Sequence, residues 1–339
     1  MKTPESQGLK MYKSILIIGL FVFSATSTFA QIKLAQTGAQ FLSVGSDARA
    51  AGIGESMTAN ALGSASLFYN PAGMASLSNE FEFSASQNRW IADILHNSFS
   101  IALKINNDDR YGVFGASMMS VDYGDIQGTV VWPNDPGFID TDILTPTAKM
   151  IGFGYAIALN DKFSVGGQAK YIGLNFGYSL YPDAEGNPTL TKKNLLFANG
   201  FDFGTLYRTG WKTLAFGMSV RNFSNEVKFE EEGFQLPLTF SMGLSMDVFD
   251  LISETHKGHN LLVSIDALHY RARPEQVRIG AEYTLSNSFS LRSGYQSNTD
   301  ETSMSYGFGL NLFGINLDYA YTPFGIWNEV QRFTIRFGI

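Results

Sequence analysis

The sequence lacks cysteine altogether. Without thiols the chain can form neither a disulfide bond nor a thiolate metal site, and no lipid-bearing cysteine follows an export signal. Charged residues are also scarce, at 16% of the chain, and the formal net charge is −7. Because proteins that bind nucleic acid carry a basic surface, this acidic balance argues against a nucleic-acid partner.

Long apolar segments are missing as well, apart from one near the N-terminus. Lys10 and Lys13 precede an apolar run at residues 15–23, and the small residues at 28–30 form a cleavage site. The run is too short to cross a bilayer as a helix. We therefore predict that residues 1–30 are a cleaved signal peptide and that the rest of the chain is exported.

The sequence also lacks the patterns of an active site. Neither G-x-S-x-G nor H-E-x-x-H occurs. His256 and His259 are close in sequence but fall in a polar turn, which indicates a solvated loop. The consecutive Glu230, Glu231 and Glu232 do not give the converging carboxylates with separated pKa values that acid–base catalysis needs. We therefore expect no enzymatic activity, no catalytic or metal-binding residue and no cofactor.

Glycine and aromatic residues are abundant, with 34 glycines and 14% aromatics. From residue 80 onward, apolar and polar residues alternate with a period of two, which indicates β-strands. The pattern predicts fourteen strands, at residues 80–88, 94–104, 111–121, 147–159, 163–176, 195–207, 214–223, 236–248, 260–268, 276–285, 289–297, 304–312, 315–322 and 330–339. Most are about 9–11 residues long, the length that a tilted strand needs to cross a bilayer. An even number of such strands is typical of a bacterial outer-membrane barrel.

The connections between these strands alternate in length. Short ones lie at 106–109, 160–161, 209–213, 286–288 and 313–314, and long ones at 122–146, 177–194, 224–235 and 323–329. Only 249–259 is longer than its place among the short turns predicts. Membrane barrels have short periplasmic turns and long external loops, whereas a soluble sandwich gives no reason for this alternation. We therefore predict an all-β, transmembrane antiparallel barrel at residues 80–339, integral to the outer membrane and surrounded by its lipid.

Residues 38–78 have a different character, because they are rich in small residues and almost uncharged. Ser46 or Asp47 is placed to cap a short helical turn, and Pro71 suits the first position of another. Several strands pair a bulky face with a Gly and Ala face, and such small inward residues would leave room for an inserted segment. We predict that residues 31–79 form an N-terminal tail and a plug inside the barrel.

Two stretches of this plug carry a family resemblance. They read G-S-D-A-R-A-A-G-I-G at 45–54 and L-F-Y-N-P-A-G-M-A at 67–75. Together with the fourteen-strand body, they resemble the PorV/PorQ family of outer-membrane proteins, which is related to the FadL-type hydrophobic transporters. The motif residues that carry the resemblance are Asp47, Arg49, Gly52, Gly54, Asn70, Pro71 and Gly73. The resemblance implies a plugged barrel from a Bacteroidetes-type bacterium with a type IX secretion system.

Two functions follow from the resemblance. The first is a non-enzymatic component of type IX protein secretion and attachment, which docks the translocon, the C-terminal signal domains of cargo or the attachment complex. Its candidate partner-binding loop is residues 122–146, with an aromatic anchor beside turn residues. The residues proposed for this contact are Trp132, Pro133, Asp135 and Phe138. Whether the chain belongs to the PorV-like or the PorQ-like branch stays open.

The alternative function is a FadL-like channel for the uptake or export of hydrophobic small molecules. It predicts an apolar pocket that opens to lipid through a kinked wall, with glycines at 152–154 or 166–167 as candidate kink positions. The alternation places arginines on the inner face, which argues against an apolar conduit. These inward arginines are predicted at 221, 278, 292, 332 and 336.

Overall fold

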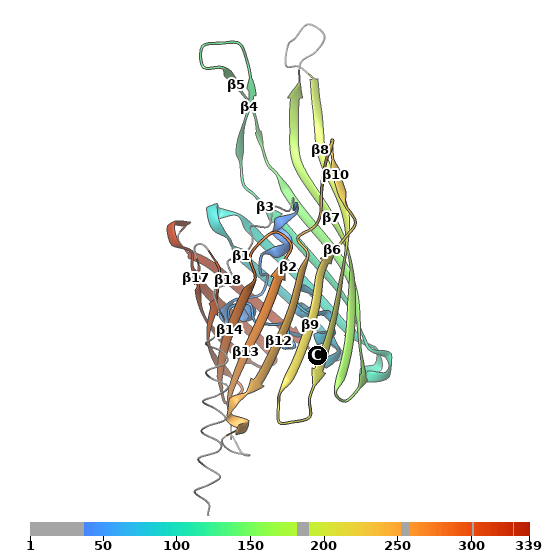
Figure 1. Ribbon diagram of the computed structural model, residues 1–339. Helices are drawn as coiled ribbons and strands as arrows, with labels where there is room; N and C mark the ends of the chain where they lie inside the picture. Colours follow the sequence, from blue (N-terminus) through green and yellow to red (C-terminus); the bar gives the residue numbers. More distant parts are fainter. Residues whose placement is uncertain (1–36, 182–189, 252–257, 300–301, 328) are drawn as a thin grey trace, which may run out of the picture. The chain divides into compact units, whose positions relative to one another are not determined.

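The computed structural model describes residues 37–181, 190–251, 258–299, 302–327 and 329–339. The predicted signal peptide lies outside the described residues. Fourteen strands of the described part close into one antiparallel barrel (Figure 1). They are β1 (Phe81–Arg89), β2 (Leu95–Lys104), β3 (Val113–Asp122), β6 (Thr147–Asn160), β7 (Phe163–Tyr181), β8 (Leu190–Arg208), β9 (Ala215–Phe223), β12 (Thr239–Asp247), β13 (His259–Tyr270), β14 (Gln276–Leu285), β15 (Phe289–Gln296), β16 (Met304–Leu312), β17 (Ile315–Pro323) and β18 (Glu329–Gly338).

The barrel closes because its first strand pairs with its last. β1 and β18 run antiparallel, with Phe83 opposite Phe337. Every other barrel strand pairs with the barrel strands before and after it in the chain. In hydrocarbon an unpaired backbone N–H or C=O costs several kcal/mol, because lipid offers no hydrogen-bond partner. Closure pairs these groups by removing the open edges of the sheet. The predicted fourteen-strand barrel is confirmed.

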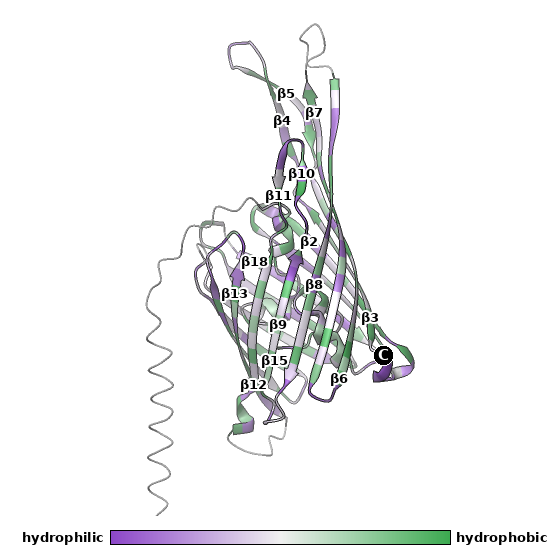
Figure 2. Ribbon diagram, turned by 45° about the vertical axis from the view of Figure 1, so that its right-hand side comes forward, coloured by the Kyte–Doolittle hydropathy of each residue, from purple (hydrophilic) through white to green (hydrophobic). Residues whose placement is uncertain are grey.

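Side chains alternate between the two faces of the wall as the sequence predicts. In β18, Phe333 is 50% exposed on the outer face, whereas Thr334 is 0% and Arg336 only 7% exposed on the inner face. Figure 2 shows this alternation as green and purple positions along the strands. The outer face is therefore apolar and suited to lipid, and the polar groups of the wall point inward.

The two ends of the barrel differ in their connections. At one end, the turn end, β14–β15 and β16–β17 are joined by short turns. The opposite end carries two additional hairpins, β4 (Ile126–Val131) with β5 (Phe138–Leu144), and β10 (Val227–Phe229) with β11 (Glu232–Phe234). We call this the hairpin end. Figure 1 shows the β4–β5 hairpin and the ends of β7 and β8 projecting there beyond the other strands.

Both projections exceed what the sequence analysis predicts. β7 continues to Tyr181 and β8 begins at Leu190, so each is longer than its predicted strand. The stretch expected to be a long loop between β3 and β6 folds instead into the paired β4–β5 hairpin. The longer connection at 249–259 begins with the short helix η7 (Val248–Leu251), and its remainder lies partly outside the described residues.

Residues 38–78, which we call the inner segment, form four short helices. They are η1 (Gln40–Ser43), α2 (Ala48–Gly52), η2 (Gly63–Phe68) and η3 (Pro71–Ser76). The Asp47 side chain caps α2 by accepting a hydrogen bond from Ala50 N, and Asn70 caps η3 in the same way from Ala72 N. Pro71 stands at the first position of η3, where its missing N–H costs no helical hydrogen bond.

The inner segment packs against the inner face of the wall, where glycines allow close backbone approach. A Cβ on Gly166 would lie 2.6 Å from Ala72 N, and one on Gly217 would lie 2.1 Å from Thr58 O. These contacts are with backbone atoms, which cannot move aside as a flexible side chain can. The small inward residues of the barrel therefore leave the space that the inner segment fills.

The wall is irregular at positions other than the predicted kinks. Register shifts occur between Ala158 and Asn160 and between Asn175 and Tyr178, and a third lies in the pairing of β8 with β9. Pairing continues unbroken through residues 152–154 and 166–167. The kink prediction at those glycines is therefore wrong, because Gly154 and Gly166 make room for the inner segment instead. Among the described helices, none has the length and apolar character of a membrane span.

Candidate functional site

Buried ion pairs join the inner segment to the barrel wall. An Asp47 carboxylate oxygen lies 2.8 Å from the guanidinium of Arg336 in β18. Arg49 donates two hydrogen bonds to Glu282 in β14, both at 2.8 Å. The Glu282 carboxylate, and more weakly those of Asp318 and Asp47, hold the pKa of Arg49 above its ordinary value. The two charged residues of the 45–54 motif therefore attach α2 to two strands of the wall, β18 and β14.

Arg292 in β15 extends this network. Its guanidinium lies 2.5 Å from Glu282 and 2.8 Å from Asp318 in β17. Charges taken out of water are costly unless they are paired, and removal of one partner leaves an uncompensated buried charge. The network consequently opposes displacement of the inner segment from the lumen.

The glycines of the first motif lie against the same wall. Gly54 adopts a positive φ of 64°, and its N–H donates to Ser305 Oγ at 3.1 Å. A Cβ on Gly52 would approach the Arg292 side chain at 3.1 Å and Gly307 at 3.2 Å. Gly54 therefore needs glycine for its conformation, and a side chain at residue 52 would make tight contacts with the wall.

The second motif is anchored through Asn70. Its amide donates to Thr58 O at 2.7 Å within the inner segment and to Thr205 O of β8 at 3.0 Å. Pro71 lies beside Gly166, and a Cβ on Gly73 would meet Ser66 Oγ at 2.7 Å. The structure thus brings both motifs to the lumen, where they make structural contacts.

Tyr69 belongs to the same site, although it is not among the predicted site residues. Its hydroxyl accepts hydrogen bonds from the backbone N–H groups of Ser46 and Asp47, each at 3.2 Å. Burial raises the pKa of Tyr69 well above its ordinary value, so the phenol stays neutral. Its place within the F-Y-N-P-A-G stretch marks Tyr69 as a candidate. The sequence does not reveal its hydrogen-bond partners, because they lie more than twenty residues away.

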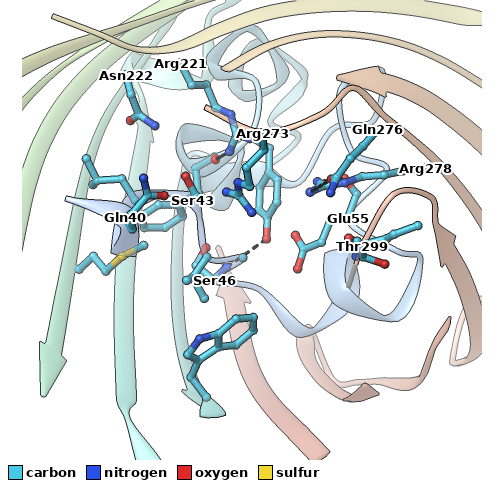
Figure 3. A pocket seen from close by; sticks show the side chains of 18 of the residues that line it. Gln40, Ser43, Ser46, Glu55, Arg221, Asn222, Arg273, Gln276, Arg278 and Thr299 are labelled. Atoms are coloured by element: carbon cyan, nitrogen blue, oxygen red, sulfur yellow. Dashed lines mark hydrogen bonds between the residues drawn. The ribbon is translucent and has the colours of Figure 1, made fainter. Parts of the chain in front are cut away.

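A cavity of about 510 Å³ lies at the hairpin end of the lumen (Figure 3). Its floor is made by the inner segment, including Ser46, Glu55 and Tyr69, and the connections around the mouth contribute Arg273 and Thr299. We call it the mouth cavity. Part of its wall is apolar, with Leu42, Phe68, Trp90, Met119, Met150 and Phe324.

The polar part of the mouth cavity includes several charged side chains. Seven line it, namely Glu55, Lys170, Asp202, Arg221, Arg273, Arg278 and Arg332. Lys170 is paired with Asp202 at 2.7 Å, and Arg332 lies 3.8 Å from Glu55. The structure also places Arg292 and Arg336 inward, as the alternation predicts. The lumen is therefore polar and charged.

The candidate partner-binding residues lie together at the tip of the β4–β5 hairpin. Trp132 N donates to Gly137 O at 3.0 Å, which closes the turn that contains Pro133 and Asp135. Pro133, Asp135 and Phe138 are exposed, and Trp132 is half-buried. The tip is far from the inner segment in the fold, so the structure presents two separate candidate surfaces, one inside the lumen and one above it.

The described part of the chain holds no group of three or more His, Asp or Glu side chains placed to bind a metal. His259 Nδ1 instead lies 2.7 Å from the hydroxyl of Tyr283. His256, its neighbour in the sequence, falls outside the described residues.

Comparison with known proteins gives a family and a fold. A family model described as type IX secretion system protein PorV matches residues 27–268. No curated protein matches the sequence. Among solved structures, the Ralstonia pickettii toluene transporter TbuX is 13% identical with a TM-score of 0.56, over 86% of this chain and 97% of that one.

Two further solved structures are similar. The Pseudomonas putida toluene transporter TodX has a TM-score of 0.56 at 11% identity, covering 90% of this chain and 98% of its own. A Pseudomonas aeruginosa FadL homologue has a TM-score of 0.51 at 11% identity, covering 86% and 97%. At such low identity these likenesses show the fold alone. The closed barrel with its apolar outer face and the match to the PorV family together identify the protein as an integral outer-membrane barrel.

Proposed function

Because the chain belongs to the family of the type IX secretion system protein PorV, we propose that it is a non-enzymatic docking component of that machinery. Its partners are the secretion translocon, the C-terminal signal domains of secreted proteins or the attachment complex. The barrel holds the protein in the outer membrane, and the hairpin end faces the cell exterior and receives the partner.

The single observation that carries this proposal is the projecting hairpin end. Apolar side chains of the β4–β5 hairpin are exposed there, with Val131 87% exposed, Ile143 61% and Ile126 49%. On the barrel an exposed apolar side chain faces lipid, but β4 and β5 pair only with each other, outside the closed sheet. Exposed apolar side chains on such an extension are typical of a protein–protein contact surface.

The tip of the β4–β5 hairpin supplies the anchor. Trp132 and Phe138 flank its turn, and aromatic residues are enriched among those that dominate binding energy at interfaces. Asp135 and Asn134 lie in the turn between them, and Asn134 donates to Phe138 O at 3.0 Å, which holds the turn together. A pre-formed tip loses little conformational entropy when a partner binds.

The inner segment acts as a plug in this proposal. Ala48, Ala72 and Met74 in it are completely buried, and ion pairs attach it to β14 and β18. A lumen filled in this way supports docking on the outside of the barrel more than passage through it.

A FadL-like channel is the second candidate, and two observations favour it. The mouth cavity has an apolar wall that includes Met119 and Met150. The pairing of β7 with β8 also shifts register between Asn175 and Tyr178, at the rim where these two strands leave the closed sheet. This role would be supported if reconstituted protein carried toluene into liposomes faster than protein-free controls.

One experiment distinguishes the docking role from the channel role. The tagged protein is affinity-purified from its native outer membrane in mild detergent, and mass spectrometry identifies the proteins and lipids recovered with it. Docking predicts stoichiometric recovery of a large translocon barrel or of secreted proteins that share a C-terminal domain. A lone barrel that carries bound hydrocarbon would contradict docking and support the channel.

A further inference from the structure

The mouth cavity contains a cluster of arginines that the docking role does not use. Arg221, Arg273 and Arg278 reach it from β9, from the connection after β13, and from β14 (Figure 3). Among the described residues, the cavity's two carboxylates are engaged elsewhere, because Asp202 pairs with Lys170 and Glu55 lies nearest Arg332. The cavity thus holds more positive than negative charge.

Tyr270 brings two of these guanidinium groups together. Arg273 lies over its ring, 4.7 Å from the centroid. Arg278 donates a hydrogen bond to its hydroxyl at 2.7 Å. Two like charges are therefore held within the length of one tyrosine side chain, an arrangement that costs free energy unless water or an anion screens it.

The arginines are also oriented in advance. Arg221 lies 6.0 Å from the centroid of the Tyr69 ring, and it donates to Phe68 O at 2.6 Å. A guanidinium stacked on a ring keeps its edge donors in a fixed plane, the geometry that matches the two oxygens of a carboxylate or phosphate.

Two guanidinium nitrogens of the cluster lack a hydrogen-bond partner. Arg278 is more than nine-tenths buried and donates through Nη1 to Glu55 O and through Nη2 to the Tyr270 hydroxyl. Its Nε and the Nε of Arg221 are buried and have no hydrogen-bond partner among the described residues. Buried charged donors without a partner are costly, and a site that must recognise an anion is one place where they persist.

We propose that the mouth cavity binds a small oxyanion, a molecule that carries phosphate or carboxylate groups, through the guanidinium groups of Arg221, Arg273 and Arg278. The cavity volume of about 510 Å³ suits a small molecule. The proposal goes beyond the docking role and does not depend on it. The carboxylate of Glu55 shares the cavity and opposes an anion bound there, so it limits the affinity.

Isothermal titration calorimetry of the full-length protein in neutral detergent tests this site, with inorganic pyrophosphate and citrate as probes. We expect saturable binding of at least one probe that weakens as sodium chloride is added. Binding of pyrophosphate alone would identify a phosphate site, and binding of citrate alone a carboxylate site; either supports the proposal. Failure of both probes to bind would overturn it.

Three variants assign the binding to the arginines. Arg273→Gln should weaken it about tenfold, because one charge-assisted contact is lost, and Arg278→Gln should do the same. Glu55→Gln should strengthen binding severalfold, since it removes the competing carboxylate. Arg110→Gln, an exposed arginine at the turn end, is the matched control and should bind as the natural protein does.

If Arg278→Gln fails to fold, the Arg273→Gln variant still tests the assignment. Arg273 lies in the connection between β13 and β14, and its described contact is with the Tyr270 ring, so its replacement should leave the barrel folded. Unchanged affinity in a folded Arg273→Gln protein would overturn the assignment. Equal weakening in the Arg110→Gln control would also overturn it, because the binding would then reflect general surface charge.

Discussion

Asp47 and Arg336 are joined by an ion pair of 2.8 Å, although 289 residues separate them in the sequence. The contact ties the first turn of α2 to the last strand of the barrel. Both side chains are buried, so neither has bulk water as an alternative partner. The inner segment is therefore part of the folded barrel, held by specific charges.

Asp47→Asn should destabilise the protein by about 3 kcal/mol, because Arg336 keeps a buried charge without its main partner. The amide oxygen of asparagine can still cap α2 at Ala50, so the substitution isolates the ion pair from the cap. Thermal unfolding in detergent, followed by circular dichroism, measures the loss. The matched control is Asp161→Asn in an exposed turn. An equal midpoint in the two variants would contradict this role.

Neighbouring glycines in β7 give a test of where the inner segment lies. A Cβ at residue 166 would press on backbone atoms of Pro71 and Ala72, at 2.6 Å, whereas one at residue 167 meets its nearest atom at 3.4 Å. We expect Gly166→Ala to lose about 2 kcal/mol through overpacking and Gly167→Ala to change stability by less than about 0.5 kcal/mol.

Thermal midpoints and protease resistance of residues 38–78 check this pair of variants. Both variants replace glycine by alanine in the same strand, so the intrinsic change in strand propensity is the same. They differ in the face to which the new Cβ points, and only the one at residue 166 meets the inner segment. Equal effects would mean that the inner segment does not press on the wall at Gly166.

Tyr69→Phe should cost about 1–3 kcal/mol near neutral pH, because two buried N–H groups lose their acceptor. Burial raises the pKa of Tyr69, so above pH 10 the unfolded chain releases this proton while the folded protein keeps it. The stability of the natural protein should therefore fall as pH rises past 10, and this contribution should disappear in Tyr69→Phe. Denaturation midpoints at pH 8 and pH 11 measure the difference. Identical pH dependence in the two proteins would rule out a buried neutral phenol.

Trp132→Ala and Phe138→Ala should weaken partner binding without loss of the barrel. Aromatic anchors at an interface typically contribute 2 kcal/mol or more, so at least a tenfold rise in dissociation constant is expected for one of them. Binding of the purified partner on a sensor surface measures this. Leu312→Ala, an exposed apolar residue at the turn end, is the control. Full affinity in both tip variants would place the contact elsewhere on the hairpin end.

The strands could be predicted because each crosses between lipid and a polar lumen, which imposes alternation on the sequence itself. Arg332 and Arg336 were assigned inward on that basis alone, and the structure agrees. The β4–β5 hairpin could not be predicted in the same way, because its strands lie outside the closed sheet and need no regular length. The apolar residues on both sides of the turn at 132–137 are the sequence feature that indicates this hairpin.

The contacts of the inner segment could not be predicted from the sequence. Its motif residues were identified, but their partners depend on the closed barrel. Arg49 meets Glu282 across 233 positions, and Thr58 meets Asp266 across 208. The mouth cavity was missed for the same reason, because the inner segment, strands and loops assemble it only after closure.

The most direct test of docking at the hairpin end is removal of residues 126–144, replaced by a short Gly-Ser linker, followed by affinity purification from the native outer membrane. Substitution of the 286–288 turn at the opposite end serves as the control. The docking account predicts a heat-modifiable, folded barrel that no longer recovers its translocon or cargo partner, while the control recovers it in full. Undiminished recovery by the folded deletion protein would contradict it.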